Sequence, residues 1–256
     1  MRLVLGLESK LRDIASYTVN FLLLLIAWQL LSTASREILP GPVETARWMV
    51  SNETLSSTAY NILITLRNAV IGFLLALLLA VATGLVSRIN SFLDSLVASL
   101  NVYVQSISAL IWILVFLVIF GFRSPVPPIL VTTGVAYPIL LSSLLGGIKA
   151  VDKKVVELAE LLGATKRQLF THIYIPASLP YTIAGSRAAL GAALRISVVA
   201  EAFGSSGGIG YKLTYYFNMY NYEGMMGWAS ILIVIMVLLD KLILQPVEGI
   251  SRRWLP

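Results

Sequence analysis

The sequence contains no cysteine and only one histidine, His172, among its 256 residues. The lack of cysteine excludes disulfide bonds, thiolate nucleophiles and cysteine-ligated metal centres. His172 has no second metal ligand near it in the sequence, so we expect no metal site. The 13 aspartates and glutamates are scattered along the chain and suggest no catalytic cluster. These absences argue against an enzyme.

Charged residues are also few, at 12% of the chain compared with about 25% in soluble domains. Hydrophobic residues make up 57%, and the mean hydropathy is +0.84. This composition predicts an all-α polytopic membrane protein in which residues 1–256 form a single transmembrane domain. In a membrane protein the net charge of +6 is interpreted from where the basic residues lie relative to the membrane, so nucleic-acid binding is not expected. The chain lacks a Gly-x-x-x-x-Gly-Lys-Ser/Thr loop, so it cannot cradle the phosphates of ATP itself.

Apolar runs of about 20 residues are long enough to cross a hydrocarbon core of about 30 Å. We predict about six spans, at 15–33, 60–86, 104–121, 126–147, 178–203 and 226–246. Residues 89–103 are apolar enough to be helical and to enter the membrane obliquely ahead of the third span. Residues 40–56 predict a turn followed by a short amphipathic helix at the membrane interface.

The distribution of basic residues predicts the orientation of these spans. With a cytoplasmic N-terminus, twelve lysines and arginines fall in cytoplasmic segments, and only four fall outside: Arg36, Arg47, Arg123 and Lys212. This asymmetry follows the positive-inside rule, and it places both termini and the loop at residues 148–177 in the cytoplasm. No small-residue cleavage site follows the first apolar run, so we expect a retained helix rather than a signal peptide.

The sequence of this cytoplasmic loop predicts two short helices joined by a tight turn. Asp152 is placed to cap the first helix, and Gly163 falls where its C-terminus needs a left-handed residue. Thr165 and Gln168 have the spacing of a capping box for the second helix. Pro176 then marks the expected return into the membrane. An amphipathic helix held by a tight turn can place its apolar face in a groove on a partner. The alternative is a hairpin that only connects two spans.

The loop reads Glu157-Leu158-Ala159, then Gly163, then Ile173-Tyr174-Ile175-Pro176. It resembles the "EAA–Gly–Ile-x-Leu-Pro" loop of ABC importer permeases, which grips the ATPase subunit. Leu158 replaces the usual first alanine, and Ile175 replaces the usual leucine. The resemblance implies an ATPase-docking surface made by Glu157, Leu158, Ala159, Glu160, Gly163, Ala164, Ile173 and Pro176.

Further segments resemble the permeases of the nitrate/sulfonate/taurine/bicarbonate group, over roughly residues 38–250. They are Leu39-Pro40-Gly41-Pro42, Thr65-Leu66-Arg67, Gly185-Ser186-Arg187-Ala188-Ala189-Leu190-Gly191, and Ala200-Glu201 with Ser206-Gly207-Gly208-Ile209-Gly210-Tyr211. The chain departs from this group at residues 105–112, which lack the three prolines of its "RPIPPLAW" segment. It also has Arg195 where an apolar residue is usual.

The resemblance implies a type I ABC importer permease that is not itself an enzyme. Two copies of the chain would form a pore, and two copies of a separate ATPase subunit would bind ATP and Mg. A periplasmic or extracellular binding protein would deliver the substrate, a small anion of the nitrate, sulfonate/taurine or bicarbonate class. A vitamin precursor is the alternative substrate. A stand-alone secondary transporter would favour midplane carboxylates and inverted repeats, and no repeat is visible.

Arginines inside predicted spans are costly in lipid, so they should face the protein interior or a water-filled path. We expect the path to be lined by Gln105, Ser106, Ser108, Arg187, Arg195 and Glu201. For Arg67 and Arg187 the alternative is a structural role, through pairing with Glu201 or with helix C-terminal carbonyls, or through snorkelling. A structural role is also open for Arg195.

Overall fold

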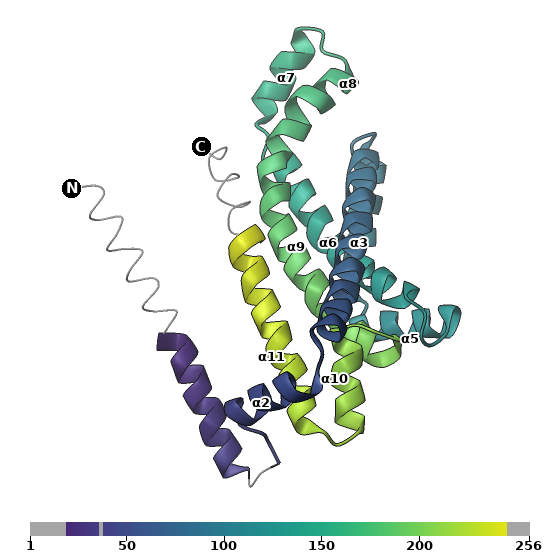
Figure 1. Ribbon diagram of the computed structural model, residues 1–256. Helices are drawn as coiled ribbons and strands as arrows, with labels where there is room; N and C mark the ends of the chain where they lie inside the picture. The colour runs from purple at the N-terminus through teal and green to yellow at the C-terminus, as the bar shows by residue number, and fades with distance from the viewer. Residues whose placement is uncertain (1–18, 36–37, 245–256) are drawn as a thin grey trace, which may run out of the picture.

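The computed structural model describes residues 19–35 and 38–244, and Figure 1 shows their arrangement. Within these ranges the regular structure is entirely helical, which confirms the predicted all-α fold. The two termini of the chain, for which we predict a cytoplasmic location, lie outside the described residues. The same is true of residues 15–18 of the first predicted span and 245–246 of the last.

Four helices are long and apolar enough to cross a membrane: Leu55–Ser87, Val126–Lys149, Arg167–Gly204 and Tyr222–Leu242. The first two are α3 and α6. The third includes α9 (Ile175–Gly204), and the fourth includes α11 (Tyr222–Leu239). Helix α6 lies between α3 and α9 (Figure 1) and packs against both.

The core at this three-helix contact is built from large residues on α6 and small residues on its neighbours. Leu140 and Leu141 of α6 are fully buried against alanines of α3 and α9: Ala76, Ala80, Ala189 and Ala193. Small side chains let helix backbones approach closely, which favours helix association in lipid.

The predicted third span at 104–121 is not a continuous helix. Helix α4 (Ser91–Ser106) and helix α5 (Ala109–Phe120) meet at an angle of 87°. Ile107 and Ser108 have extended backbone, and the Ser108 carbonyl accepts the first hydrogen bonds of α5. With 12 residues, α5 is about 18 Å long and is too short to span alone.

The described residues therefore contain four candidate spans by length and composition, or five if the bent pair counts as one, and the predicted six are not confirmed. Helix Val19–Ala34, within the first predicted span, is apolar but shorter than a typical span.

The helix predicted to begin after Pro176 instead starts within the loop at residues 148–177. Helix α8 (Lys166–Leu169) continues through a π-helical turn, η1 (Phe170–Tyr174), directly into α9. Proline has no N–H to donate, and its ring crowds the carbonyl four residues earlier. The Ile175 N–H bonds to the Phe170 carbonyl, five residues back, so the wider turn lets the helix pass Pro176 without a break.

Two pairs of short helices lie at opposite ends of the molecule (Figure 1). Helices α7 (Lys153–Leu161) and α8 form one end, and α2 (Pro42–Asn52) and α10 (Ile209–Asn218) form the other. Helix α2 is the short helix predicted within residues 40–56, and it packs against α11.

Candidate docking loop and transport groove

The loop at residues 148–177, which we call the docking loop, folds as its capping residues predict. The Asp152 carboxylate accepts the Lys154 N–H at 2.9 Å, which caps α7. Gly163 has a φ of +82°, the left-handed conformation expected at the end of that helix. Thr165 and Gln168 form the capping box: the Thr165 N–H donates to Gln168 Oε1 at 2.9 Å, and the Gln168 N–H donates to Thr165 Oγ1 at 3.3 Å.

The apolar face of α7 and its turn is exposed. The side chains of Leu161 and Leu162 are 85% and 80% exposed, and Leu158 is 59% exposed. A contiguous exposed apolar face of this kind is typical of a surface that binds a partner.

Between α7 and α8 lies a cavity of about 330 Å³, which we call the docking groove. It is lined by Ala159, Leu162, Gly163, Ala164, Gln168, Leu169, His172 and Ile173. Four of the predicted docking residues are in this list. Glu157, Leu158 and Glu160 are exposed on α7 beside it, and Pro176 is exposed on α9 outside it. The groove can hold the side chains of a partner, with the carboxylates at its edge available to basic residues.

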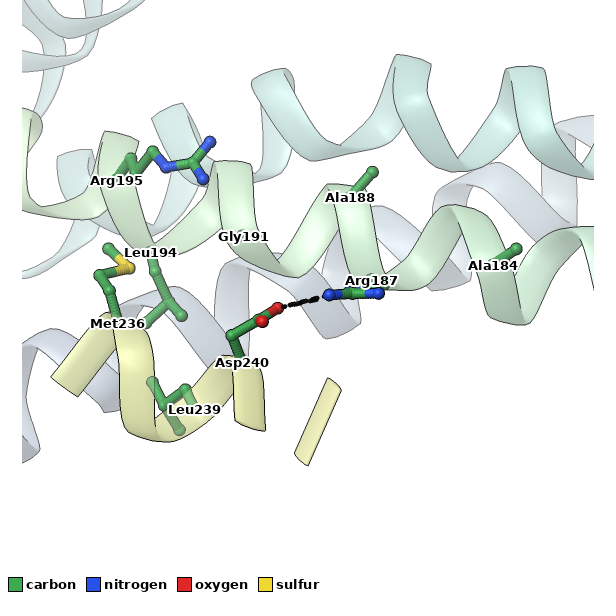
Figure 2. Close-up of a pocket in the computed structure, with 9 residues that line it drawn as sticks. All are labelled: Ala184, Arg187, Ala188, Gly191, Leu194, Arg195, Met236, Leu239 and Asp240. Carbon is green, nitrogen blue, oxygen red and sulfur yellow. Dashed lines mark hydrogen bonds and ion pairs between the residues drawn. The ribbon is translucent and has the colours of Figure 1, made fainter. Parts of the chain in front are cut away.

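A second cavity, of about 450 Å³, lies between α9 and α11, and we call it the α9–α11 groove (Figure 2). Arg187 donates from Nη2 to Asp240 Oδ1 at 2.9 Å across it. The partner of Arg187 is thus Asp240, and not Glu201 as considered from the sequence. The other lining residues are Ala184, Ala188, Gly191, Leu194, Arg195, Met236 and Leu239.

Arg195 lies on the exposed face of α9, and its side chain points away from α11 (Figure 2). Ala184 and Ala188 are exposed on the same face at helical spacing, about three and two turns closer to the docking loop. This face presents a positive charge beside small residues that permit the close approach of another helix.

Glu201 lies elsewhere, fully buried where α3, α9 and α10 meet. Its carboxylate accepts four hydrogen bonds, from Thr65 Oγ1 at 2.7 Å, Asn68 Nδ2 at 2.9 Å, Ser197 Oγ at 3.2 Å and the Gly210 N–H at 3.3 Å. Such a carboxylate has its acceptor sites satisfied within the protein and does not line the groove.

The contact of α3, α9 and α10 around Glu201, which we call the joint, also holds the start of α10. The Gly208 N–H donates to Asn61 Oδ1 at 2.9 Å, and the Ile209 N–H donates to Thr65 Oγ1 at 2.9 Å. Together with the Gly210 bond to Glu201, side chains from other helices therefore satisfy three amides at the N-terminus of α10. The sequence singled out these glycines and Glu201 only through a family resemblance, and it did not reveal this joint.

Arg67 supports the joint indirectly. Its guanidinium donates from Nη2 to Asn68 Oδ1 at 3.1 Å, which orients the Asn68 amide so that its nitrogen faces Glu201. This contact favours the structural role for Arg67 over a role in the path.

The remaining predicted path residues, Gln105, Ser106 and Ser108, are exposed at the bend between α4 and α5. They do not line the α9–α11 groove. Of the six predicted path residues, the structure brings only Arg187 and Arg195 together there.

A buried ion pair at the α2 end was not foreseen. Glu53 Oε1 accepts from Lys212 Nζ at 2.9 Å, Tyr216 Oη at 2.7 Å and Trp228 Nε1 at 3.2 Å, so it links α2, α10 and α11. Burial alone would raise the pKa of Glu53, but these three hydrogen bonds outweigh it and hold the pKa below its usual value of 4.5. Burial and the neighbouring carboxylate raise the pKa of Tyr216.

Glu53→Gln is expected to destabilise the protein by about 1–3 kcal/mol at pH 7, because Lys212 loses its charged partner. Since the folded pKa of Glu53 lies below its unfolded value, the contribution of the carboxylate is present above pH 4.5 and is lost as the pH falls below it. Thermal unfolding of both proteins from pH 7 to pH 3.5 should show their difference shrinking in acid. A difference that stays constant over this range would contradict the role given to the ionised carboxylate.

A family model described as "binding-protein-dependent transport system inner membrane component" matches residues 70–253. The chain is 26% identical over 226 residues to the nitrate import permease of Synechococcus elongatus, covering 84% of this chain and 80% of that one. It is 30% identical over 190 residues to a putative aliphatic sulfonates transport permease of Bacillus subtilis, covering 73% and 68%. It is 27% identical over 199 residues to the formylaminopyrimidine transport permease of Halalkalibacterium halodurans, covering 76% and 78%.

Among solved structures, the chain is similar to one from the MetNI methionine ABC transporter in inward facing conformations. The TM-score is 0.67 at 18% identity, and the match covers 79% of this chain and 98% of the other. This similarity supports the fold described above.

Proposed function

Because the chain belongs to the family of binding-protein-dependent transport inner membrane components, and is thus a permease component of a type I ABC importer, we propose that two copies form one pore. The docking groove of each copy binds one subunit of a separate ATPase. A periplasmic or extracellular binding protein supplies the substrate, and ATP-driven closure of the ATPase pair moves the docking loops and switches access from outside to inside.

The observation that carries this proposal is the exposed apolar face at the docking groove. Leu161 and Leu162 are the most exposed large apolar side chains of the loop, and Gly163 fixes their presentation through its left-handed turn. In the proposed orientation this surface lies in the cytoplasm, where ATP is available. A loop that only joined two spans would have no use for such a face.

The exposed face of α9 supports the two-copy pore. Ala184, Ala188 and Arg195 point outward from the described fold. A second copy packed across this face by a two-fold axis would enclose the two Arg195 side chains between the protomers. The ion pair of Arg187 with Asp240 would lie beside this path.

The test is native mass spectrometry of the complex formed when the chain is co-expressed with the ATPase encoded next to it. We expect two copies of each subunit, and we expect Gly163→Val to lose or weaken the assembly, because valine at positive φ strains the turn by about 1–3 kcal/mol. Gly121→Val is the matched control, since Gly121 also has positive φ (+80°) and open space around it, but lies outside the loop. A stable assembly that never includes an ATPase would overturn the proposal.

We propose a small anion as the substrate, which Arg195 would contact in the pore. The arginine supports this choice because an uncompensated positive charge on the path favours an anion. Arg195→Gln should reduce the transport of nitrate or an aliphatic sulfonate by about tenfold, the effect of losing one charged hydrogen bond of roughly 1.5 kcal/mol. Uptake in proteoliposomes that contain the ATPase and the binding protein checks this. Unchanged uptake of a confirmed anionic substrate would contradict the role of Arg195.

The similarity to a formylaminopyrimidine permease keeps a vitamin precursor as the second candidate. The two are separated by screening ligands of the associated binding protein, with nitrate, sulfonates and pyrimidines as the probes.

A further inference from the structure

A third cavity, of about 180 Å³, lies at the docking-loop end of the molecule, where α3 and α6 end and α9 begins. We call it the elbow crevice. Its walls are mostly large apolar side chains, including Val81, Leu85, Leu144, Ile148, Phe170 and Leu179. Two of the wall hydroxyls donate to carbonyls of their own helix, Ser178 to Ile175 at 3.0 Å and Thr182 to Ser178 at 2.9 Å, and the third belongs to Tyr174. The crevice therefore suits a hydrocarbon.

A cation lies at the mouth of this crevice. The Arg88 guanidinium is 5.0 Å from the centre of the Tyr174 ring, and Tyr174 is a wall residue. Arg88 is exposed at the end of α3, one turn beyond Leu85 of the wall. Arginine and tyrosine together are typical of the boundary between hydrocarbon and lipid headgroups.

The elbow crevice faces away from the proposed pore. On α9 its wall residues Ile175 and Leu179 precede Ala184 by nine and five residues, which at about 100° per residue is a turn of about 180° and 140°. Leu85, Ile175 and Leu179 are about half exposed, so the crevice is open at its sides. A second copy packed on the Ala184 face would leave it open to lipid.

We propose that the elbow crevice binds an anionic phospholipid, with an acyl chain between α3, α6 and α9 and the phosphate on Arg88. The guanidinium can donate two hydrogen bonds to one phosphate. The assignment to the cytoplasmic leaflet rests on the proposed location of the docking loop, and this leaflet carries the negative headgroups that Arg88 attracts. The bound chain would contact the π turn Phe170–Tyr174, which joins the docking loop to α9.

The test is a titration of the purified chain in detergent, followed by native mass spectrometry, with phosphatidylglycerol and phosphatidylcholine of identical acyl chains. We expect the wild type to bind phosphatidylglycerol about fivefold more tightly, the gain expected from one basic residue at an anionic headgroup. Arg88→Gln should remove this preference, and Arg88→Lys should keep most of it. Arg47→Gln, at an exposed position on α2 at the other end of the molecule, is the matched control and should leave the preference unchanged.

A second variant tests the acyl-chain site. Val81→Phe enlarges a wall side chain that is 41% exposed, so it narrows the crevice without disturbing the core. It should weaken the binding of both lipids by a similar factor. Equal affinity of the wild type for the two lipids, or a preference that survives Arg88→Gln or is equally lost in Arg47→Gln, would overturn the proposal. The titration contains no ATPase, so its result is independent of whether the importer complex assembles as proposed.

Discussion

Glu201→Ala is expected to destabilise the protein by about 2–6 kcal/mol, because two buried donors lose their acceptor at a cost of about 1–3 kcal/mol each. These donors are the Asn68 amide and the Gly210 N–H. The Thr65 hydroxyl has an alternative acceptor, the Asn61 carbonyl at 3.4 Å. The Ser197 hydroxyl, which also bonds to the carboxylate, can rotate to a backbone carbonyl one turn earlier on its own helix, so the loss for these two hydroxyls is smaller. Thermal unfolding in detergent gives the total effect, and hydrogen exchange should show faster exchange at Gly208, Ile209 and Gly210.

Two further variants make this result specific. Glu201→Gln keeps one oxygen for Asn68 but turns an NH₂ group toward the Gly210 N–H, so we expect an intermediate loss of about 1–3 kcal/mol. Glu223→Ala removes an exposed carboxylate from the first turn of α11 and should change stability by less than about 0.5 kcal/mol. If Glu201→Ala were as mild as Glu223→Ala, the joint between α3, α9 and α10 would not depend on this carboxylate.

Leu162→Asp should weaken the binding of the ATPase by about 30-fold or more and reduce transport accordingly. Leu162 lines the docking groove and is 80% exposed, so its contribution to the stability of the chain is small, while we expect a large contribution to the proposed ATPase interface. Hot-spot residues at the centre of an interface contribute about 2 kcal/mol or more, and a charge placed there also costs desolvation. Binding of the purified ATPase and ATP-dependent uptake in proteoliposomes measure the two effects.

Leu55→Asp is the control for this variant. Leu55 is 87% exposed at the first position of α3, at the other end of the molecule, and an acidic residue is favourable at a helix N-terminus. It should bind the ATPase as the wild type does. Full ATPase binding by Leu162→Asp would show that the docking groove is not the interface.

Local sequence signals predicted the docking loop well, because caps and turns depend on neighbouring residues. Asp152, Gly163 and the Thr165–Gln168 pair each act within a few residues of their own position, and all three appear as predicted. The break in the predicted third span was missed for the opposite reason. Its apolar composition is that of a span, but the helix breaks at Ile107 and Ser108, which have extended backbone. Neither residue is a glycine or a proline, so the sequence carried no signal for the break.

The site residues divide in the same way. Hydropathy identified the charged residues within the predicted spans but not their partners. Arg187 is 53 residues from Asp240 in the sequence, and Glu201 is 136 residues from Thr65. Such pairs are set by tertiary packing, which periodicity does not encode. Glu201 was grouped with the path as an intramembrane charge, whereas its contacts place it in a buried joint.

The continuous helix from Arg167 to Gly204 has a mechanical consequence. Its 38 residues make a rod about 57 Å long, with the docking groove at one end and Glu201 near the other. A tilt of about 5° at the loop would carry the far tip through about 5 Å, roughly the pitch of one helical turn. The N-terminus of α10 is attached to that tip by the hydrogen bond from the Gly210 N–H to Glu201. A lever of this kind needs no chain of intermediate contacts to carry a push on the docking loop to the opposite face of the membrane.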